Sequence, residues 1–178
     1  MACVRRKVRK RRITSVATSG RASVGGTIDS RLKDLGIALP AVVAPLANYV
    51  GSVKTGNLLY VSGQLCLGPD GRPVATGKLG ADVTVEAGQR AARACAVNLI
   101  AQVKAAIGDL DRLARVVRLG GFISAAPDFL DAAKVMNGAS DLFVDVFGDK
   151  GRHARTTIGV AVLPLDAAVE VEGLFEIA

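Results

Sequence analysis

The sequence predicts an α+β domain in which a single β-sheet carries two helices on one face. Segments with the alternating pattern of strands flank two longer segments with helical periodicity, in the order ββαβαββ. Half of the 178 residues are apolar, which suits one compact domain with a buried core. Helices grouped in this way pack on one face of a sheet and leave its other face in need of cover.

The N-terminus carries the excess positive charge. The chain has 23 Lys and Arg against 16 Asp and Glu, and seven of the basic residues lie within residues 1–12. The remainder is therefore balanced in charge. We expect residues 1–28 to form a disordered basic tail and the folded domain to span residues 29–178. Three interpretations of the tail stay open: an organelle transit peptide, a tail for nucleic-acid binding or nuclear import, or a segment upstream of the true translation start.

Composition argues against several classes of function. The charge-balanced part of the chain has no Trp, so we expect nucleic acid to be bound only through the tail, if at all. The cysteines Cys3, Cys66 and Cys95 lack metal-ligand spacing and are odd in number, which favours a reducing compartment. A single histidine, His153, argues against His-rich metal sites. No apolar run reaches the roughly 18 residues that a membrane span needs. We expect a soluble cytoplasmic protein, or an organellar one if the tail is a transit peptide.

The first part of the domain is predicted to hold a short helix and two strands. Residues 30–36 form one or two helical turns that end at Gly36. Residues 48–53 and 57–64 alternate as strands around a turn. Gly63 interrupts the second strand, where we expect a bulge, or a point at which the backbone comes close to a ligand.

Two helices with a strand between them form the middle of the chain. The first runs from Thr84, which can cap it, to Ile107 before Gly108, and Cys95 and Asn98 lie on its apolar stripe. We expect Cys95 in the core and a hydrogen bond from Asn98 to the backbone. The strand spans residues 115–124, with a bulge expected at residues 120–121. The second helix is predicted from residue 127 to residue 146, with Asn137 at its middle.

The last stretch, residues 151–172, is predicted to form two strands joined by a turn at residues 163–166. Arg155 and Glu170 lie among β-branched residues, so we expect both charges to sit partly inside the sheet, where an unpaired charge is costly. Arg155 is a two-pronged donor suited to a carboxylate, and an apolar wall raises the pKa of Glu170 toward values useful for proton transfer. The alternative is a structural ion pair between the two strands. Because the strands are apolar on both faces, we expect a closed homo-oligomer.

Several of these segments resemble the reactive intermediate deaminase (RidA/YjgF-like) family, in a little-characterised sub-branch. The resemblance rests on YVGSVKTGNLLYVSGQ, on the helices with Asn98 and Asn137, and above all on HARTTIGVAVLPLDAAVEVE. It covers residues 29–178. It implies a chorismate-mutase-like fold that assembles as a trimeric barrel with clefts between subunits. Family members hydrolyse enamines and imines such as 2-iminobutyrate to a 2-keto acid and ammonia, and the resemblance implies that no metal or cofactor takes part.

The resemblance also assigns roles to individual residues. It implies that Arg155 grips the substrate carboxylate and that Glu170 positions or activates water. Tyr49 is implied to line the cleft, Asn137 to lie beside it, and Gly63 to bring its backbone near the ligand.

Two positions depart from the family pattern. Thr157 stands where many members carry a cysteine, although its backbone amide can still donate to a ligand, and Gly159 stands where the family often has Glu. These departures support a second hypothesis, a ligand-binding or regulatory trimer with little turnover. A third hypothesis is RNA binding or cleavage, which only the basic tail supports. A chorismate mutase is disfavoured, because a dicarboxylate calls for a second Arg in the cleft, although Arg152 is near in sequence.

Overall fold

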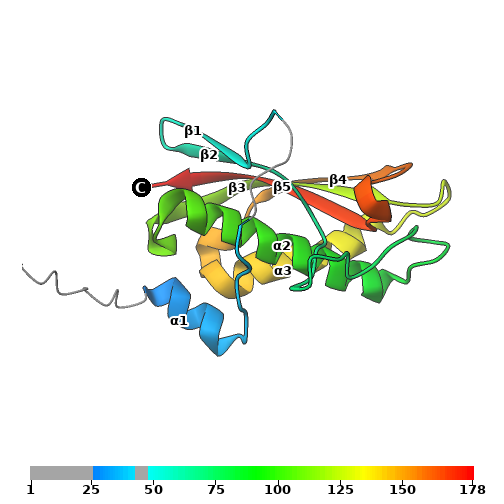
Figure 1. The fold of residues 1–178 in the computed structure, drawn as a ribbon, viewed down its shortest axis with the longest axis horizontal. Helices are drawn as coiled ribbons and strands as arrows, with labels where there is room; N and C mark the ends of the chain where they lie inside the picture. The colour runs from blue at the N-terminus through cyan, green and yellow to red at the C-terminus, as the bar shows by residue number, and fades with distance from the viewer. Residues whose placement is uncertain (1–25, 43–47) are drawn as a thin grey trace, which may run out of the picture.

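The computed structural model describes residues 26–42 and 48–178, so most of the predicted tail, including Cys3, lies outside the described residues. Five strands form one sheet in the order β1-β2-β5-β3-β4 (Figure 1). Every pair is antiparallel except β3 and β4, which run parallel. The elements are α1 (Thr27–Asp34), β1 (Ser52–Thr55), β2 (Leu58–Leu65), α2 (Val85–Ile107), β3 (Leu113–Ser124), α3 (Ala132–Phe147), β4 (Ala154–Val160) and β5 (Val169–Ile177), with 3₁₀ turns at Leu110–Arg112, Gly148–Gly151 and Pro164–Asp166.

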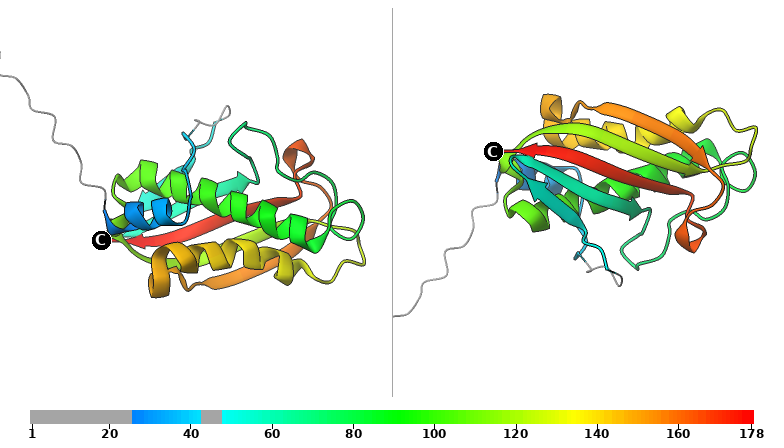
Figure 2. Two further views of the ribbon diagram at one scale, coloured as in Figure 1. Left: turned by 90° about the horizontal axis from the view of Figure 1, so that it is seen from below. Right: turned by 90° about the horizontal axis from the view of Figure 1, so that it is seen from above.

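Helices α2 and α3 lie side by side on one face of the sheet, and the strands are open to view on the other face (Figure 2). The predicted α+β architecture, with one sheet and two helices on one face, is therefore confirmed. The short α1 is a third helix, and it packs at the edge of this layer against α3. No helix in the described part of the chain is long and apolar enough to span a membrane.

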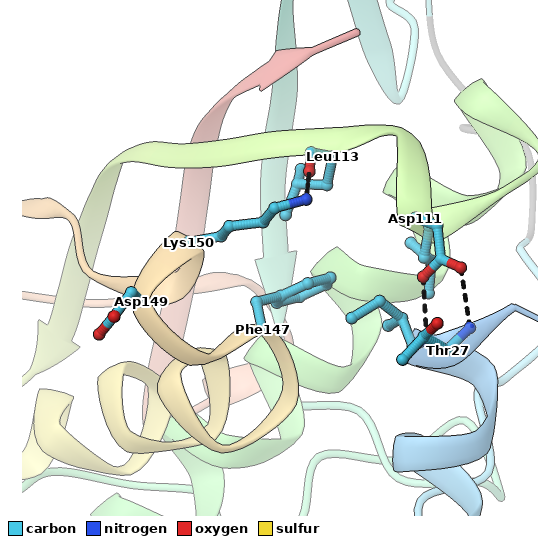
Figure 3. A pocket seen from close by; sticks show the side chains of 8 residues that line it. Thr27, Asp111, Leu113, Phe147, Asp149 and Lys150 are labelled. Carbon is cyan, nitrogen blue, oxygen red and sulfur yellow. Dashed lines mark hydrogen bonds between the residues drawn. The ribbon is translucent and has the colours of Figure 1, made fainter.

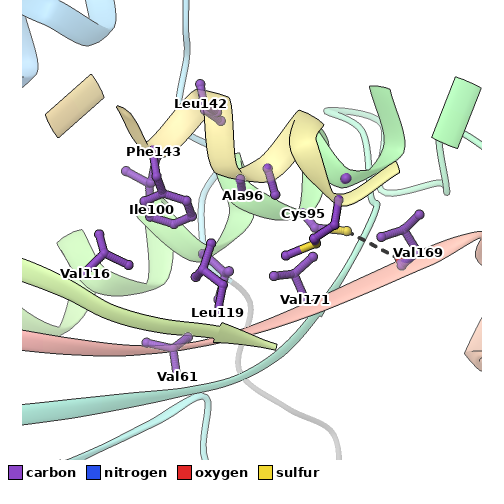
Figure 4. Packing of buried hydrophobic residues seen from close by; sticks show 14 of the residues in the cluster. Val61, Cys95, Ala96, Ile100, Val116, Leu119, Leu142, Phe143, Val169 and Val171 are labelled. Atoms are coloured by element: carbon purple, nitrogen blue, oxygen red, sulfur yellow. Dashed lines mark hydrogen bonds between the residues drawn. The ribbon is translucent and has the colours of Figure 1, made fainter. Parts of the chain in front are cut away.

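The core fills the space between the sheet and the two long helices (Figure 4). Leu119 and Val171 reach it from the sheet, Cys95 and Ile100 from α2, and Phe143 from α3, and all five are fully buried. Small residues such as Ala91, Ala92 and Ala96 on α2 let this helix lie close to its neighbours. The prediction that Cys95 belongs to the core is confirmed.

Local sequence signals set both ends of α2. The Thr84 side chain accepts a hydrogen bond from the Ala87 N–H, and Gly108, with a φ of 79°, ends the helix. Asn98 donates from its side-chain amide to the carbonyls of Leu65 and Leu67, both at 3.0 Å. The predicted helix and the predicted role of Asn98 are therefore confirmed.

The start of α1 depends on a residue far away in the sequence. The Asp111 carboxylate accepts hydrogen bonds from the backbone N–H groups of Thr27, at 2.8 Å, and Ile28, at 3.0 Å (Figure 3). A helix N-terminus has unpaired N–H groups and a partial positive charge, and a carboxylate satisfies both. Helix α1 begins at Thr27, two residues before the predicted domain boundary at residue 29.

Two element boundaries were predicted wrongly. Helix α3 begins at Ala132 instead of residue 127, because the preceding segment is tied to a distant loop: Ala125 bridges to Leu79, and the Ala126 N–H donates to the Leu79 carbonyl. The first predicted strand begins at Ser52 instead of residue 48. The error at α3 arises from a contact between sequence-distant segments, which local pattern does not report.

The bulges are distributed differently from the prediction. The bulge at Gly63 is confirmed, because the β2–β5 register shifts between Val61 and Gln64. Gly120 and Gly121 lie in continuous register with both neighbouring strands, so no bulge occurs there. These glycines instead leave room for side chains: a Cβ at Gly120 would meet Glu172, and a Cβ at Gly121 would meet Met136.

Candidate functional site

Arg155 lies on the edge strand β4 and points to the helix side of the sheet. Its partner in the β3 register is Leu119, which is fully buried under the helices. The guanidinium reaches α3, where Nη1 donates to Asn137 Oδ1 at 2.9 Å and to Ser140 Oγ at 3.0 Å. Nη2 donates to the Ala133 carbonyl at 3.3 Å. The side chain is exposed but held by three hydrogen bonds from one helix.

Ser140 and His153 continue this network toward the protein interior. Ser140 Oγ lies 3.1 Å from His153 Nε2, and His153 Nδ1 lies 2.6 Å from the Gly151 carbonyl oxygen. The pKa of His153 is lowered, first because the ring is partly buried and also because Arg155 is positive; the Gly151 carbonyl acts in the opposite direction. Neither Ser140 nor His153 was singled out as a functional residue from the sequence.

Thr157 shares the helix side of β4 with Arg155, two residues further along. It pairs with Gly121, whose missing side chain makes room for Met136 of α3. Among the described residues, its Oγ1 is the buried side-chain oxygen without a hydrogen-bond partner. A buried hydroxyl without a partner is uncommon, because desolvation then goes uncompensated.

Glu170 lies on the other face of the sheet, on the central strand β5. Its carboxylate covers Gly63 on β2: a Cβ at Gly63 would lie 1.9 Å from Glu170 Oε1. Only a residue without a side chain leaves space for this carboxylate. The pKa of Glu170 is raised, first by burial and then by the negative charge of Glu172, as the sequence predicted.

Glu172 forms a polar cluster beside Glu170 on the same face. Arg118 Nη1 donates to Glu172 Oε1 at 2.9 Å, and Tyr60 donates its hydroxyl to Oε2 at 2.8 Å. The hydrogen bond to Glu172 is the largest cause of the raised pKa of Tyr60. Glu172 therefore has a cation and a hydroxyl donor, whereas no hydrogen bond or salt bridge involves the Glu170 side chain among the described residues. This cluster was also missed from the sequence.

Five of the six predicted site residues fall into two groups within one chain. Arg155, Asn137 and Thr157 gather on the helix side at β4, and Glu170 and Gly63 meet on the open side. Tyr49 lies before β1 with 59% of its surface exposed.

The alternative of an Arg155–Glu170 ion pair is wrong. Strand β3 lies between β4 and β5, and the two side chains project from opposite faces. The expectation that Arg155 is partly buried in the sheet is also wrong, because β4 is an edge strand and the side chain is exposed.

Two hollows of similar size, about 460 and 420 Å³, lie at α1 and include none of these residues. The described residues contain no cluster of three or more His, Cys, Asp or Glu side chains that could hold a metal ion. The larger hollow, of about 460 Å³, lies between α1 and the C-terminal end of α3 (Figure 3). Its polar lining is engaged in structural contacts, since Asp111 caps α1 and Lys150 donates to the Leu113 carbonyl at 2.9 Å.

Comparison with known proteins defines the family. Residues 29–177 match the family described as "YjgF/chorismate mutase-like, putative endoribonuclease". The chain belongs to the YjgF family. The match covers all the strands and both long helices, so the fold and the site geometry above belong to this family domain.

Individual relatives range from strong to moderate similarity. Protein TCP17 of Trypanosoma cruzi is 51% identical over 164 residues, which is 92% of this chain and 98% of that protein. The solved structure of Atu1372 from Agrobacterium tumefaciens, of unknown function, is 49% identical, covers 85% of this chain and 93% of that one, and has a TM-score of 0.77. The 2-iminobutanoate/2-iminopropanoate deaminase of the mite Dermatophagoides farinae is 29% identical over 138 residues, or 78% of this chain and 92% of the mite protein.

Proposed function

We propose that this YjgF-family protein hydrolyses 2-imino acids and their enamine forms to 2-keto acids and ammonia. The proposal rests on the hydrogen bonding of Arg155, which leaves part of its guanidinium free. Helix α3 engages three of its N–H groups. A guanidinium has five, so one N–H on Nε and one on Nη2 remain for a ligand. Neighbouring N–H groups of this kind bind a carboxylate side by side. Among the described residues, no acidic side chain forms a salt bridge with Arg155.

Glu170 supplies the proton transfer. An imine carbon is already electrophilic, so catalysis needs an oriented substrate, a placed water and a group that moves a proton. The water oxygen bonds to the imine carbon while Glu170 accepts a water proton and delivers it to the imine nitrogen, which forms a carbinolamine. Glu170 then transfers the carbinolamine hydroxyl proton to the nitrogen, so that the C–N bond breaks, ammonia leaves and the carbonyl forms. The raised pKa of Glu170 suits a group that accepts a proton and returns it.

The proposed site combines two subunits of a homotrimer. Within one chain Arg155 and Glu170 occupy opposite faces, so each cleft takes Arg155 from one subunit and Glu170 from its neighbour. The open face of the sheet exposes Val53, Tyr60 and Ile158 by 54%, 43% and 48% of their surfaces. Apolar side chains exposed over a sheet favour burial against another copy of the chain. In this arrangement Tyr49 and the Thr157 amide line the cleft.

A coupled assay tests the proposal. A PLP-dependent dehydratase generates 2-iminobutyrate, and the protein is expected to shorten its lifetime, which reduces trapping by semicarbazide. Arg155→Ala is expected to slow the reaction by roughly 30-fold to several thousand-fold, because a desolvated, charge-assisted contact is lost. Arg155→Lys should rescue little, since an ammonium lacks the fork. Imine decay at the buffer rate with the wild-type protein would overturn the proposal.

A ligand-binding trimer with little turnover is the second candidate. It is favoured by Thr157 and Gly159, which replace residue types common in the family. The two candidates separate in Glu170→Gln, which keeps the shape of the side chain and removes its proton acceptance. For an enzyme, this variant binds 2-keto acids normally and loses turnover. For a binding protein, the variant and the wild type bind equally and neither accelerates imine decay.

A further inference from the structure

We propose that Ser140 and His153 are positioning residues, which hold the Arg155 guanidinium in the orientation that presents its free Nε and Nη2 hydrogens to an anionic ligand. The inference rests on the proposed function for the role of Arg155 as the carboxylate-binding group. It adds two residues that the family resemblance did not supply, and it assigns each one a direction of hydrogen bonding.

The direction of each hydrogen bond follows from the Gly151 carbonyl. A carbonyl only accepts, so His153 Nδ1, at 2.6 Å, carries the hydrogen. In a neutral ring Nε2 is then an acceptor, and the Ser140 hydroxyl donates to it across 3.1 Å. The Ser140 oxygen can then accept a hydrogen bond from Arg155 Nη1, which lies 3.0 Å away. A relay of hydrogen bonds thus runs from Arg155 through Ser140 and His153 to the Gly151 carbonyl.

Packing holds the inner end of this chain in place. Gly151 lies against the backbone of α3, and a Cβ there would be 2.1 Å from the Phe143 carbonyl oxygen. The carbonyl of Gly151 therefore has a fixed position that other residues could not reproduce. The Phe143 ring meets the His153 ring edge to face, with centroids 6.2 Å apart and planes at 70°. The orientation of the His153 ring and the direction of its hydrogen bonds are therefore set by Gly151 and Phe143, independently of Arg155.

Both Nη1 hydrogens of Arg155 are consumed by this arrangement. One goes to Asn137 and the other to Ser140, so the guanidinium plane is fixed by two side chains from one helix. Without the Ser140 oxygen, the guanidinium can rotate, and an Nη1 hydrogen is left without its partner. The expected result is weaker binding of a carboxylate, with the fold unchanged.

The test uses the full chain and 2-oxobutyrate as the probe. Ser140→Ala is expected to weaken 2-oxobutyrate binding about tenfold in calorimetry, the scale of one hydrogen bond to a charged group. Ser140→Thr keeps the hydroxyl and is expected to bind within about threefold of the wild type. Thr84→Ala is the control, because it removes the cap of α2, which forms no hydrogen bond with Arg155, Ser140 or His153, and it is expected to lower stability without changing their hydrogen bonds. Unchanged affinity in Ser140→Ala would overturn the inference.

Two NMR measurements need no ligand. The chain has one histidine, so its ¹⁵N signals are unambiguous. The hydrogen on Nδ1 and the bare Nε2 are expected in the wild type, and the opposite tautomer would overturn the relay. The NMR signal of the Arg155 guanidinium is assigned by its disappearance in Arg155→Lys. Rotation of this guanidinium is expected to be slow in the wild type and faster in both Ser140→Ala and His153→Phe. Slow rotation in both variants would overturn the relay, whatever their affinity.

The measurements also separate this inference from the proposed function. If the wild type shows the expected tautomer and slow rotation, lost in Ser140→Ala, but does not bind 2-oxobutyrate, the positioning relay stands and the proposed function fails. If 2-oxobutyrate binds and Ser140→Ala binds it equally well, the role of Arg155 as the carboxylate-binding group stands and the positioning role is wrong.

Discussion

Arg155 and Glu170 project from opposite faces of one sheet, with strand β3 between their strands. Each chain has a guanidinium held by α3 and a carboxylate with a raised pKa, but the two do not face each other. In the proposed arrangement, each subunit contributes its Arg155 to one site and its Glu170 to another. In the proposed trimer, assembly and chemistry are linked, so that complementation between subunits tests both.

Subunit complementation is the first prediction. Arg155→Ala and Glu170→Gln are each expected to be inactive, whereas trimers refolded from an equal mixture regain activity. In random mixed trimers about a quarter of the clefts combine an intact Arg155 with an intact Glu170 from the neighbouring chain. The measurement is imine hydrolysis before and after mixing, with light scattering to confirm three chains per particle. Absence of recovery in confirmed mixed trimers would mean that both residues act from the same subunit.

The second prediction concerns Gly63, where a Cβ would lie 1.9 Å from the Glu170 carboxylate. Gly63→Ala is expected to displace this carboxylate and to lower turnover by at least about tenfold, while 2-keto acid binding at Arg155 is retained. Gly159→Ala is the matched control, because the nearest atom to a Cβ there is 3.8 Å away. Equal turnover in the two variants would contradict the proposed role of Glu170.

A third prediction follows from the raised pKa of Glu170. The folded protein holds the Glu170 proton more tightly than the unfolded chain does. This stabilisation is complete below the ordinary pKa of Glu and is lost as pH rises through the folded-state pKa. Glu170→Gln has no ionisable group, so it is expected to melt higher than the wild type at neutral pH, with the difference vanishing toward about pH 4. Thermal melts across this range provide the check, and a constant difference would contradict the prediction.

The fourth prediction concerns the cap of α1. Asp111→Ala removes the acceptor of two backbone N–H groups and is expected to cost about 1 kcal/mol of unfolding free energy. Asp149→Ala is the control, since 99% of that side chain is exposed and its ion pair with Arg152 spans 3.3 Å. Denaturant titration measures both. Similar stability of the two variants would show that Asp111 contributes little.

Deletion of the basic tail is the fifth prediction. Removing residues 1–25, which stops before the Gly26 cap, is expected to leave the melting temperature and particle size unchanged, because a strongly charged segment without apolar periodicity buries little surface. Extending the deletion through Ile28 removes both backbone donors to Asp111 and is expected to lower the melting temperature. A large loss in the shorter deletion would assign the tail a structural role.

Local signals in the sequence were sufficient to predict part of the fold and of the candidate site. The Thr84 cap, the Gly108 stop and the small-residue stripe define α2, because helix ends and faces depend on residues within a few positions of one another. A glycine within a strand pattern was sufficient to predict the Gly63 bulge, and a polar residue on an apolar stripe was sufficient to predict that Asn98 bonds to backbone, although its partners lie more than thirty residues away. The raised pKa of Glu170 was predictable from a carboxylate set among β-branched residues.

Only the tertiary structure decided which residues meet. Strand alternation shows that a strand has two faces, but the order of strands depends on pairing between distant segments, and here it inserts β3 between β4 and β5. The register of this pairing sets Arg155 beside Leu119 and Glu170 beside Phe122. It therefore places Arg155 on the helix side, against α3, and leaves Glu170 with Gly63 on the open side. The sequence by itself determined the chemical groups and most of the elements that carry them. Their separation onto two faces was decided by long-range packing, because no local propensity records which strand lies beside which.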